Sequence, residues 1–264
     1  MRFVAKRLLL FIAALVGLSI LVFLALRVLP GDVAAVMAGT NATAARIAAL
    51  RTQMGLDRPL PVQYADWLGG LLHGDLGISA ISGRSVVSQV GARSAVTFPL
   101  IMLSLAVALL IGLPLGCAAV ITRNRRWRGL FHVLAIVGGA VPALWSGLLL
   151  ILLFSHGSGL LGLFPSQGFP NDGWKDCGRA MASLVLPALA TGITAGAGIM
   201  RYTRAALGDA AQSQAVSMAM ACGMTRRQAL LRVGLRLSMP QLVSVIGLTF
   251  AQMITGVMVV ENLF

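Results

Sequence analysis

The amino-acid sequence predicts an all-α protein that crosses a membrane several times. Charged residues make up only 11% of the 264 residues, against about a quarter in ordinary globular proteins. The mean hydropathy is +0.87. Uncharged apolar runs recur along the chain, each of roughly the 20 residues that cross the hydrocarbon core as a helix. They predict five transmembrane helices, over residues 8–26, 95–120, 130–154, 181–200 and 242–260.

The first apolar run follows a basic stretch, residues 1–7 (MRFVAKR). A cleaved signal peptide has a similar beginning, but its apolar core is usually shorter than the run 8–26. The sequence R-V-L-P-G-D follows the run, where a signal peptide would have a cleavage site with small residues. We therefore expect an uncleaved first transmembrane helix with the N-terminus in the cytoplasm.

The formal net charge of +13 is distributed unevenly over the predicted topology. With the N-terminus inside, most basic residues fall on the inner side, where Asp209 is the only acidic residue. This is the positive-inside pattern of membrane proteins. It places residues 122–129 and 201–240 in the cytoplasm, and 27–94 and 155–179 outside. Because topology explains the basicity, we expect the lipid bilayer and no nucleic acid as a partner.

The outer segment between the first two runs contains two predicted helices. Residues 43–56 (TAARIAALRTQMGL) have helical periodicity. A second, amphipathic helix is expected from Val62, ending at Gly69–Gly70 or at His73–Gly74. The segment is too polar to span, so we expect it on the outer membrane face or over the mouth of a pathway. The predicted organisation is residues 1–94 (first transmembrane helix plus outer segment) and 95–264 (transmembrane core with the inner loop 201–240).

The chain lacks the residues that ATP binding, common hydrolase chemistry and ion-coupled transport require. The chain has two lysines, Lys6 and Lys175, and neither follows a glycine as a Walker A lysine must. No H-E-x-x-H or G-x-S-x-G occurs, and the three cysteines fall in different predicted compartments. The five apolar runs contain no charged residue, which disfavours a proton- or sodium-driven carrier. We expect no catalytic residue, no metal site and no cofactor in this chain.

The last inner segment combines a glycine with a basic helix. Gly223 provides a break, and Thr225 is suited to begin a helix as its N-cap. At 100° per residue Leu230, Val233 and Leu237 share one face. Arg232 and Arg236 lie roughly opposite, and Pro240 is expected to open the next transmembrane helix. The pattern fits two alternatives equally, a helix anchored to anionic lipid headgroups and a helix that docks into a soluble partner.

A family resemblance carried by sequence motifs favours the docking helix. The stretch 217–223 (SMAMACG) is similar to the E-A-A-x-x-x-G loop of bacterial ABC-importer permeases, with Ala219 and Gly223 at matching positions. Other motifs occur in the same family's order: K-R-L at 6–8, R-V-L-P-G-D at 27–32, G-L-D-x-P with Q-Y, W and G-D-L-G over 55–77, L-R-L-S-M-P at 235–240 and V-V-E-N-L-F at 259–264. The chain resembles the first permease subunit, of the dipeptide permease B type, in the dipeptide, oligopeptide and nickel import family.

The resemblance implies a subunit of the bacterial cytoplasmic (inner) membrane. It implies a second homologous permease, two ATPase subunits that bind ATP and Mg, and an extracytoplasmic substrate-binding protein. It assigns ATPase coupling to Ala219, Gly223, Thr225, Arg226, Arg227 and Arg232. An outer gate or docking surface for the binding protein is expected at Asp57, Gln63, Tyr64, Trp67 and Asp75.

The resemblance leaves the cargo open. Peptides are the first expectation, and nickel or a metal chelate is the alternative within the family. An ATPase-independent channel or a membrane scaffold is the alternative from another class. Members of the family continue after E-N-L-F with a Trp-Pro-Gly-Leu-Gly stretch and a sixth transmembrane helix. The sequence ends at Phe264, so we expect five of these six helices here.

Overall fold

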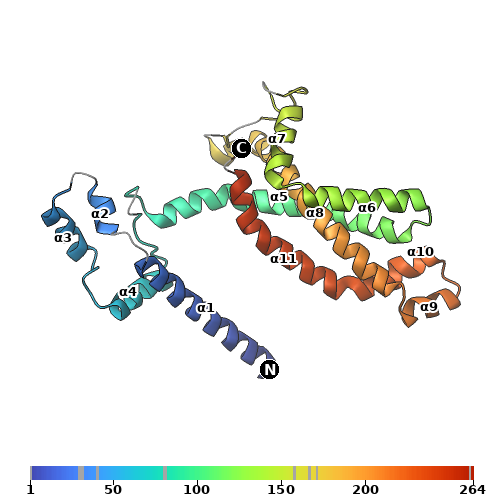
Figure 1. Ribbon diagram of the computed structural model, residues 1–264, viewed down its shortest axis with the longest axis horizontal. Helices are drawn as coiled ribbons and strands as arrows, with labels where there is room; N and C mark the ends of the chain where they lie inside the picture. The colour runs from blue at the N-terminus through green and yellow to red at the C-terminus, as the bar shows by residue number, and fades with distance from the viewer. Residues whose placement is uncertain are drawn as a thin grey trace. The chain divides into compact units, whose positions relative to one another are not determined.

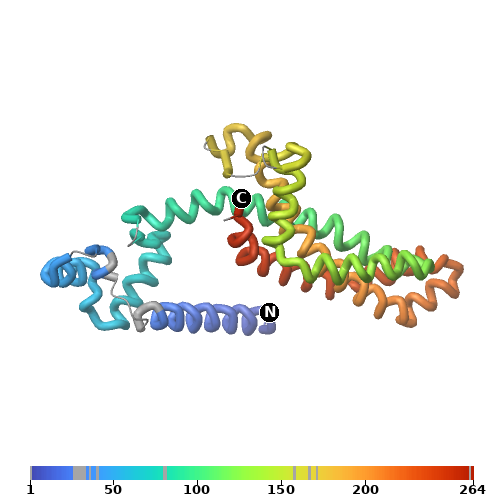
Figure 2. Tube along the Cα trace, turned by 45° about the horizontal axis from the view of Figure 1, so that its top comes forward, coloured from blue at the N-terminus to red at the C-terminus, as the bar shows by residue number. Residues whose placement is uncertain are grey.

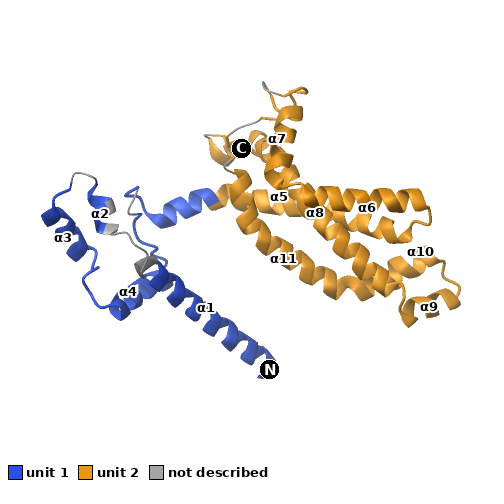
Figure 3. Ribbon diagram, in the orientation of Figure 1, with its two compact units in different colours: residues 1–93 blue, residues 94–264 orange. Residues whose placement is uncertain are grey.

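The computed structural model describes residues 2–28, 33–39, 42–79, 82–156, 159–165, 168–170, 172–261 and 263–264. Helices dominate this part of the chain (Figure 1), and the only β-type pairings among the described residues are two isolated bridges. The chain divides into two compact units, residues 1–93 and 94–264 (Figure 3). The predicted all-α, polytopic fold is confirmed.

Unit 1 contains the first apolar helix and the polar segment that follows it in the chain. Its helices are α1 (Arg2–Val28), α2 (Val33–Ala38), α3 (Ala44–Gln53) and α4 (Leu60–Leu72). The helix α4 ends with His73 as its C-cap, which is the later of the two ends that the sequence allowed. An aromatic contact joins α1 to α4: the rings of Phe23 and Tyr64 meet edge to face, with their centroids 5.4 Å apart.

Unit 2 is organised around one long central helix, α8 (Cys177–Ala210). The helices α6 (Arg125–Ala140), α7 (Ala143–Phe154) and α11 (Leu235–Glu261) all pack against α8. The remaining helical elements are α5 (Val86–Ile121), which begins in unit 1, the 3-10 turn η1 (Gly173–Lys175), α9 (Gln214–Ala221), α10 (Arg226–Ala229) and the π-helical turn η2 (Leu230–Gly234).

Small residues let α5 and α8 approach closely. A Cβ atom on Gly112 would lie 2.7 Å from the carbonyl oxygen of Gly196, and one on Gly116 would lie 2.6 Å from Cβ of Thr203. Glycines spaced four residues apart allow such backbone contact between membrane helices. A hydrogen bond of 2.6 Å between the Ser104 and Thr191 hydroxyls links the same two helices inside the packed core.

The third predicted transmembrane helix is a bent pair. We expected one helix over 130–154, whereas α6 and α7 meet at an angle of 100°. The break falls at Val141, which has an extended backbone (ψ 119°), and at Pro142, which is the N-cap of α7. Proline lacks an N–H group and disfavours helical geometry in the residue before it, so the helix ends there. The expectation of a single continuous helix was wrong.

Four stretches of the described chain are long and apolar enough to cross a membrane. They are Arg2–Ala25, Val86–Ile121, Cys177–Ala210 and Arg226–Glu261, and the bent pair of α6 and α7 makes a fifth if it crosses as one unit. The predicted number of transmembrane passages therefore agrees with the structure when the bent pair counts as one.

Candidate functional site

The inner segment, defined as residues 211–236, connects α8 to α11 through the short helices α9 and α10 and the turn η2. Figures 1 and 2 place α9 and α10 at the end of unit 2 that lies away from the C-terminal end of the chain. The chain turns after Ala210, and the Ser213 side chain caps α9 by accepting a hydrogen bond from the Val216 N–H at 3.4 Å. Val216 is buried, whereas Met218 on the other side of α9 is 69% exposed.

Gly223 ends α9 in a conformation that other residues rarely adopt. Its φ is +91°. The Gly223 N–H donates to the Met220 carbonyl at 3.0 Å, and the Met224 N–H donates to the Ala219 carbonyl at 3.1 Å. This pair of bonds is the Schellman ending, which requires a left-handed residue at the position of Gly223. The predicted glycine break is confirmed, and its physical cause is backbone geometry.

Thr225 begins the next helix through a capping box. Its hydroxyl accepts from the Gln228 N–H at 3.3 Å, and the Thr225 N–H donates to the Gln228 side-chain oxygen at 3.1 Å. Two backbone N–H groups at the start of the helix are thereby satisfied. The N-cap expected at Thr225 is confirmed.

A π-helical turn changes which side chains of the following helix face inward. The turn η2 carries one residue more per turn than an α-helix, so positions beyond it rotate relative to a count at 100° per residue. Leu230 is fully buried, but Leu237 is 50% exposed and Ser238 is buried in its place. The single face expected for Leu230, Val233 and Leu237 was therefore wrong at Leu237.

Pro240 also lies elsewhere than expected. Helix α11 begins at Leu235, so Pro240 is inside the helix and does not open it. Interior prolines are common in membrane helices because neighbouring groups can satisfy the freed backbone.

The inner segment is tied to three spanning helices. Val216, Ala229 and Leu230 form a buried inner cluster, against which Val120 and Ile121 of α5 pack. Arg226 donates from Nη1 to the Val120 and Ile121 carbonyls at 3.3 and 3.4 Å, where a cation also complements the dipole of a helix C-terminus. The turn η2 contacts both α8 and α11, and just beyond the segment Ser238 of α11 donates to the Ala206 carbonyl of α8 at 3.1 Å. The segment is thus fixed to α5, α8 and α11.

The six predicted coupling residues all lie on this one segment, but their environments differ. Ala219 is half-buried and packs on the inner cluster. Arg227 and Arg232 are exposed, whereas Arg226 is half-buried and bonded within the chain. The outward face of α9 borders a shallow hollow and carries no charge; it consists of Gln214, Ala215, Ser217, Met218 and Ala221.

The residues predicted for the outer surface are engaged locally within unit 1. Asp57 accepts from the Thr52 hydroxyl at 2.8 Å, and Asp75 accepts from the Gly77 N–H at 2.8 Å. Gln63 donates to the Arg58 carbonyl at 2.7 Å.

The two aromatic members of this set lie against α1. The hydroxyl groups of Tyr64 and Ser19 are 2.7 Å apart, and the ring of Trp67 is 6.3 Å from the ring of Phe23. Trp67 also keeps an exposed surface. The structure therefore places these residues on one polar segment beside α1, mostly in bonds that shape its turns.

A spanning groove of about 340 Å³ opens among α6, α7, α8 and α11. Its polar lining consists of Thr191, Thr194, Arg201, Tyr202, Thr249 and Gln252. Small residues such as Gly198 and Gly256 widen it. A polar groove in otherwise apolar helices is the kind of surface that lines a transport pathway. None of these groove residues was predicted as a functional residue, because apolar runs alone do not show which helix faces meet.

A second hollow of about 460 Å³ lies toward the inner end of α6 and α8. Its lining includes His132, Arg204 and Asp209, and Arg201 borders both hollows. Arg204 Nη1 lies 2.8 Å from His132 Nδ1. An arginine can only donate, so His132 accepts at Nδ1. Sequence spacing gave no sign of this pair, because its members are 72 residues apart.

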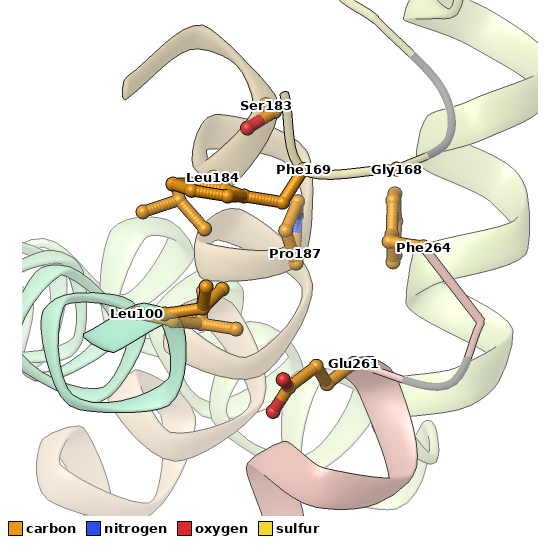
Figure 4. Close-up of a pocket in the computed structure, with 9 residues that line it drawn as sticks. Leu100, Gly168, Phe169, Ser183, Leu184, Pro187, Glu261 and Phe264 are labelled. Carbon is orange, nitrogen blue, oxygen red and sulfur yellow. The ribbon is translucent and has the colours of Figure 1, made fainter. Parts of the chain in front are cut away.

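A smaller hollow of about 220 Å³ lies near the C-terminal end of α11 (Figure 4). In Figure 4 Glu261 and Phe169 lie on opposite sides of it, with Leu100 and Pro187 between them. The Thr97 hydroxyl donates to Glu261 Oε2 at 2.8 Å. No group of three or more His, Cys, Asp or Glu side chains able to hold a metal ion occurs within the described residues.

Several membrane-spanning helices, a groove with polar lining and a packed inner segment are the features expected of a membrane transport subunit. Residues 108–264 match the family described as the binding-protein-dependent transport system inner membrane component, and residues 1–102 match the N-terminal part of such membrane components. The chain belongs to this family of inner-membrane permease subunits of ABC importers.

Individual relatives extend the similarity over the whole chain. The glutathione transport system permease protein GsiC of Salmonella typhimurium (strain LT2) is 36% identical over 264 residues, covering 100% of this chain and 82% of the relative. GsiC of Pectobacterium atrosepticum is 36% identical over 259 residues, covering 98% of this chain and 81% of the relative. GsiC of Escherichia coli (strain K12) is 35% identical over 264 residues, with 100% and 82% coverage.

Proposed function

We propose that this permease subunit forms half of a pathway for peptides that an external binding protein delivers. The relatives named for glutathione, which is itself a tripeptide, support a peptide over nickel as the cargo. The motifs shared with the dipeptide permease B type support the role of first permease subunit beside a second, homologous one. ATP and Mg are bound by two partner ATPase subunits in this proposal, and the chain itself supplies the pathway.

The inner segment is the proposed site of ATPase coupling. The observation that carries this proposal is its dual character: the inner cluster fixes it to the spanning helices, while the outward face of α9 is uncharged and uncovered. A helix with one packed face and one free face can be inserted into a groove of a partner. Closure of the ATPases would then move α9 as a rigid body together with α5, α8 and α11.

The three arginines of the segment take separate roles in this proposal. Arg227 and Arg232 are exposed and available to acidic groups of an ATPase subunit. Arg226 braces the segment through its bonds to the carbonyls at the end of α5, so its contribution is to transmit movement. Ala219, Gly223 and Thr225 set the direction of α9 and α10.

The outer segment is the proposed contact for the binding protein. Trp67 and the exposed apolar side chains of α4, such as Leu72, offer a surface for it. Asp57, Gln63 and Asp75 hold the turns that present this surface, and Tyr64 fastens it to α1. A purely structural lid is the alternative role for the same segment, and loss of binding-protein stimulation on changing Trp67 separates the two.

The coupling proposal is tested at Gly223 in the complete transporter reconstituted in liposomes. Gly223→Val should lower peptide uptake strongly while ATP hydrolysis continues, because a β-branched residue cannot hold φ at +91° and α9 would turn away. No atom lies within 4 Å of the added Cβ, so the effect is one of backbone geometry alone.

Two variants calibrate this result. Gly223→Asn should retain more uptake than Gly223→Val, because asparagine tolerates the left-handed region. Gly247→Ala is the matched control, since Gly247 lies in α11 with open space around it and no positive φ. Normal uptake together with normal stimulated ATP hydrolysis in Gly223→Val would contradict the proposal.

A further inference from the structure

Arg201 lines both the spanning groove and the second hollow at the inner ends of α6 and α8, which is called the inner hollow below. It lies near the inner end of α8, just beyond the apolar stretch of that helix. Its guanidinium covers Gly139 in the last turn of α6: a Cβ added to Gly139 would lie 2.7 Å from Nη1. The absence of a side chain at Gly139 therefore gives the guanidinium its position at the groove.

Arg201 makes no ion pair within the described part of the chain, although Asp209 lines the same inner hollow. The ion pairs found there join Arg58 to Asp66 and Arg179 to Asp176, and neither involves Arg201. An arginine guanidinium stays charged at any physiological pH, and its paired N–H donors match the geometry of a carboxylate. An uncompensated guanidinium at a groove is therefore a candidate for binding an anion that enters from outside the chain.

The groove offers hydrogen-bond acceptors as well as donors, and the Gln252 amide and the Tyr202 hydroxyl supply both. The hydroxyls of Thr194 and Thr249 donate to the Ala190 and Val245 carbonyls at 3.1 and 2.8 Å, so toward the groove they can only accept. Arg201 can only donate, and the Gln252 amide adds two further N–H donors. A peptide presents both complements, because its carboxylate accepts hydrogen bonds and its amide or ammonium N–H groups donate them.

We propose that Arg201, assisted by Gln252, binds a carboxylate of the transported peptide as it passes through the spanning groove. The threonine hydroxyls accept from the N–H groups of the same peptide. This inference rests on the proposed function of peptide import and adds to it a substrate class, peptides with a free carboxylate. The competing role for Arg201 is structural, as a cation beside the C-terminal end of α6.

The test uses the complete transporter with its second permease, ATPase subunits and binding protein in liposomes. Uptake of Ala-Ala-Glu is compared with uptake of Ala-Ala-Gln-amide, which carries no carboxylate, each at a concentration that saturates the binding protein. In Arg201→Gln we expect uptake of Ala-Ala-Glu to fall about tenfold or more, and that of the amidated peptide less than about twofold, because only the former loses a bond between a carboxylate and a charged donor.

Two further variants keep the test decisive. Arg125→Gln is the matched control, because Arg125 begins α6 as an exposed residue that lines neither hollow, and its selectivity should equal that of the unaltered transporter. Gly139→Ala keeps the charge but displaces the guanidinium, so it should reproduce the selective loss. If Arg201→Gln does not assemble, Gly139→Ala decides, and unchanged selectivity in it would overturn the inference.

The remaining outcomes separate this inference from the function on which it rests. Equal loss of both peptides in Arg201→Gln would assign Arg201 a structural role and overturn the inference, while peptide import would stand. Uptake of neither peptide by the unaltered transporter would overturn the proposed function, and the carboxylate site with it.

Discussion

Residues 54–79 of the outer segment and residues 211–236, the inner segment, are similar in composition but differ in how they pack. Both are polar, helical and interrupted by glycines with positive φ, such as Gly74 and Gly223. In the outer segment α4 buries no residue, and its polar side chains bond mainly within neighbouring turns. In the inner segment Val216, Ala229 and Leu230 are fully buried and contact α5.

This difference indicates which segment can transmit movement. A close-packed contact moves as a unit, because protein interiors are dense and do not deform gradually. The inner segment has such contacts with the spanning helices. The outer segment is shaped by hydrogen bonds of its own turns and by the contacts of Tyr64 and Trp67 with α1, which suits a surface for docking or covering.

The largest expected effect on stability comes from the difference in burial between the two segments. Leu230→Ala should lower the free energy of unfolding by about 2–5 kcal/mol, because it leaves a cavity at a fully buried site. Leu72→Ala is the matched change in the outer segment, where Leu72 is 79% exposed, and should stay within about 0.5 kcal/mol. Thermal or denaturant unfolding of the purified variants in detergent measures both. Equal effects would remove the contrast in packing.

A smaller effect is expected for the brace between the inner segment and α5. Arg226→Gln should cost about 1.5 kcal/mol or more, because two carbonyls at the end of α5 lose a charged donor. Arg227→Gln, one position along, should leave stability unchanged, since Arg227 is exposed. The same unfolding measurement applies. A stability loss in Arg227→Gln as large as that in Arg226→Gln would show that the brace is not specific.

The smallest effect compares two threonines that both precede helices. Thr225→Ala removes the capping box and should cost about 1 kcal/mol. Thr43 is the N-cap of α3, but its side chain makes no capping hydrogen bond, so Thr43→Ala should be nearly neutral. Hydrogen exchange at the first turn of each helix reports the local loss. Equal protection in Thr225→Ala and the unaltered chain would contradict the role of the cap.

Local signals in the sequence predicted the elements that local chemistry decides. The helix that begins behind Thr225 and the break at Gly223 follow from capping and from glycine geometry, and both were predicted. The bend between α6 and α7 was missed even though Val141 and Pro142 mark it, because an uninterrupted apolar run outweighed a single proline. The exposure of Leu237 could not be predicted, since a π-helical turn has no clear sequence pattern.

The functional groups that depend on tertiary contacts were beyond the sequence. In the sequence Arg201 is one of several basic residues of the inner loop. Its position over Gly139 and at the groove appears only in the structure. The pairing of Arg204 with His132 joins helices far apart in the chain. The carbonyl partners of Arg226 at the end of α5 are another tertiary contact of this kind.

The central claim is that α9 presents its outward face to an ATPase subunit on the cytoplasmic side. A photo-crosslinking residue at Met218, which is 69% exposed, tests it in the complete transporter, with the same residue at Val62 of the outer segment as the control. We predict a crosslink from Met218 to an ATPase subunit that changes in yield with ATP, and none from Val62. The absence of an ATPase crosslink at Met218, or its presence at Val62, would contradict the account.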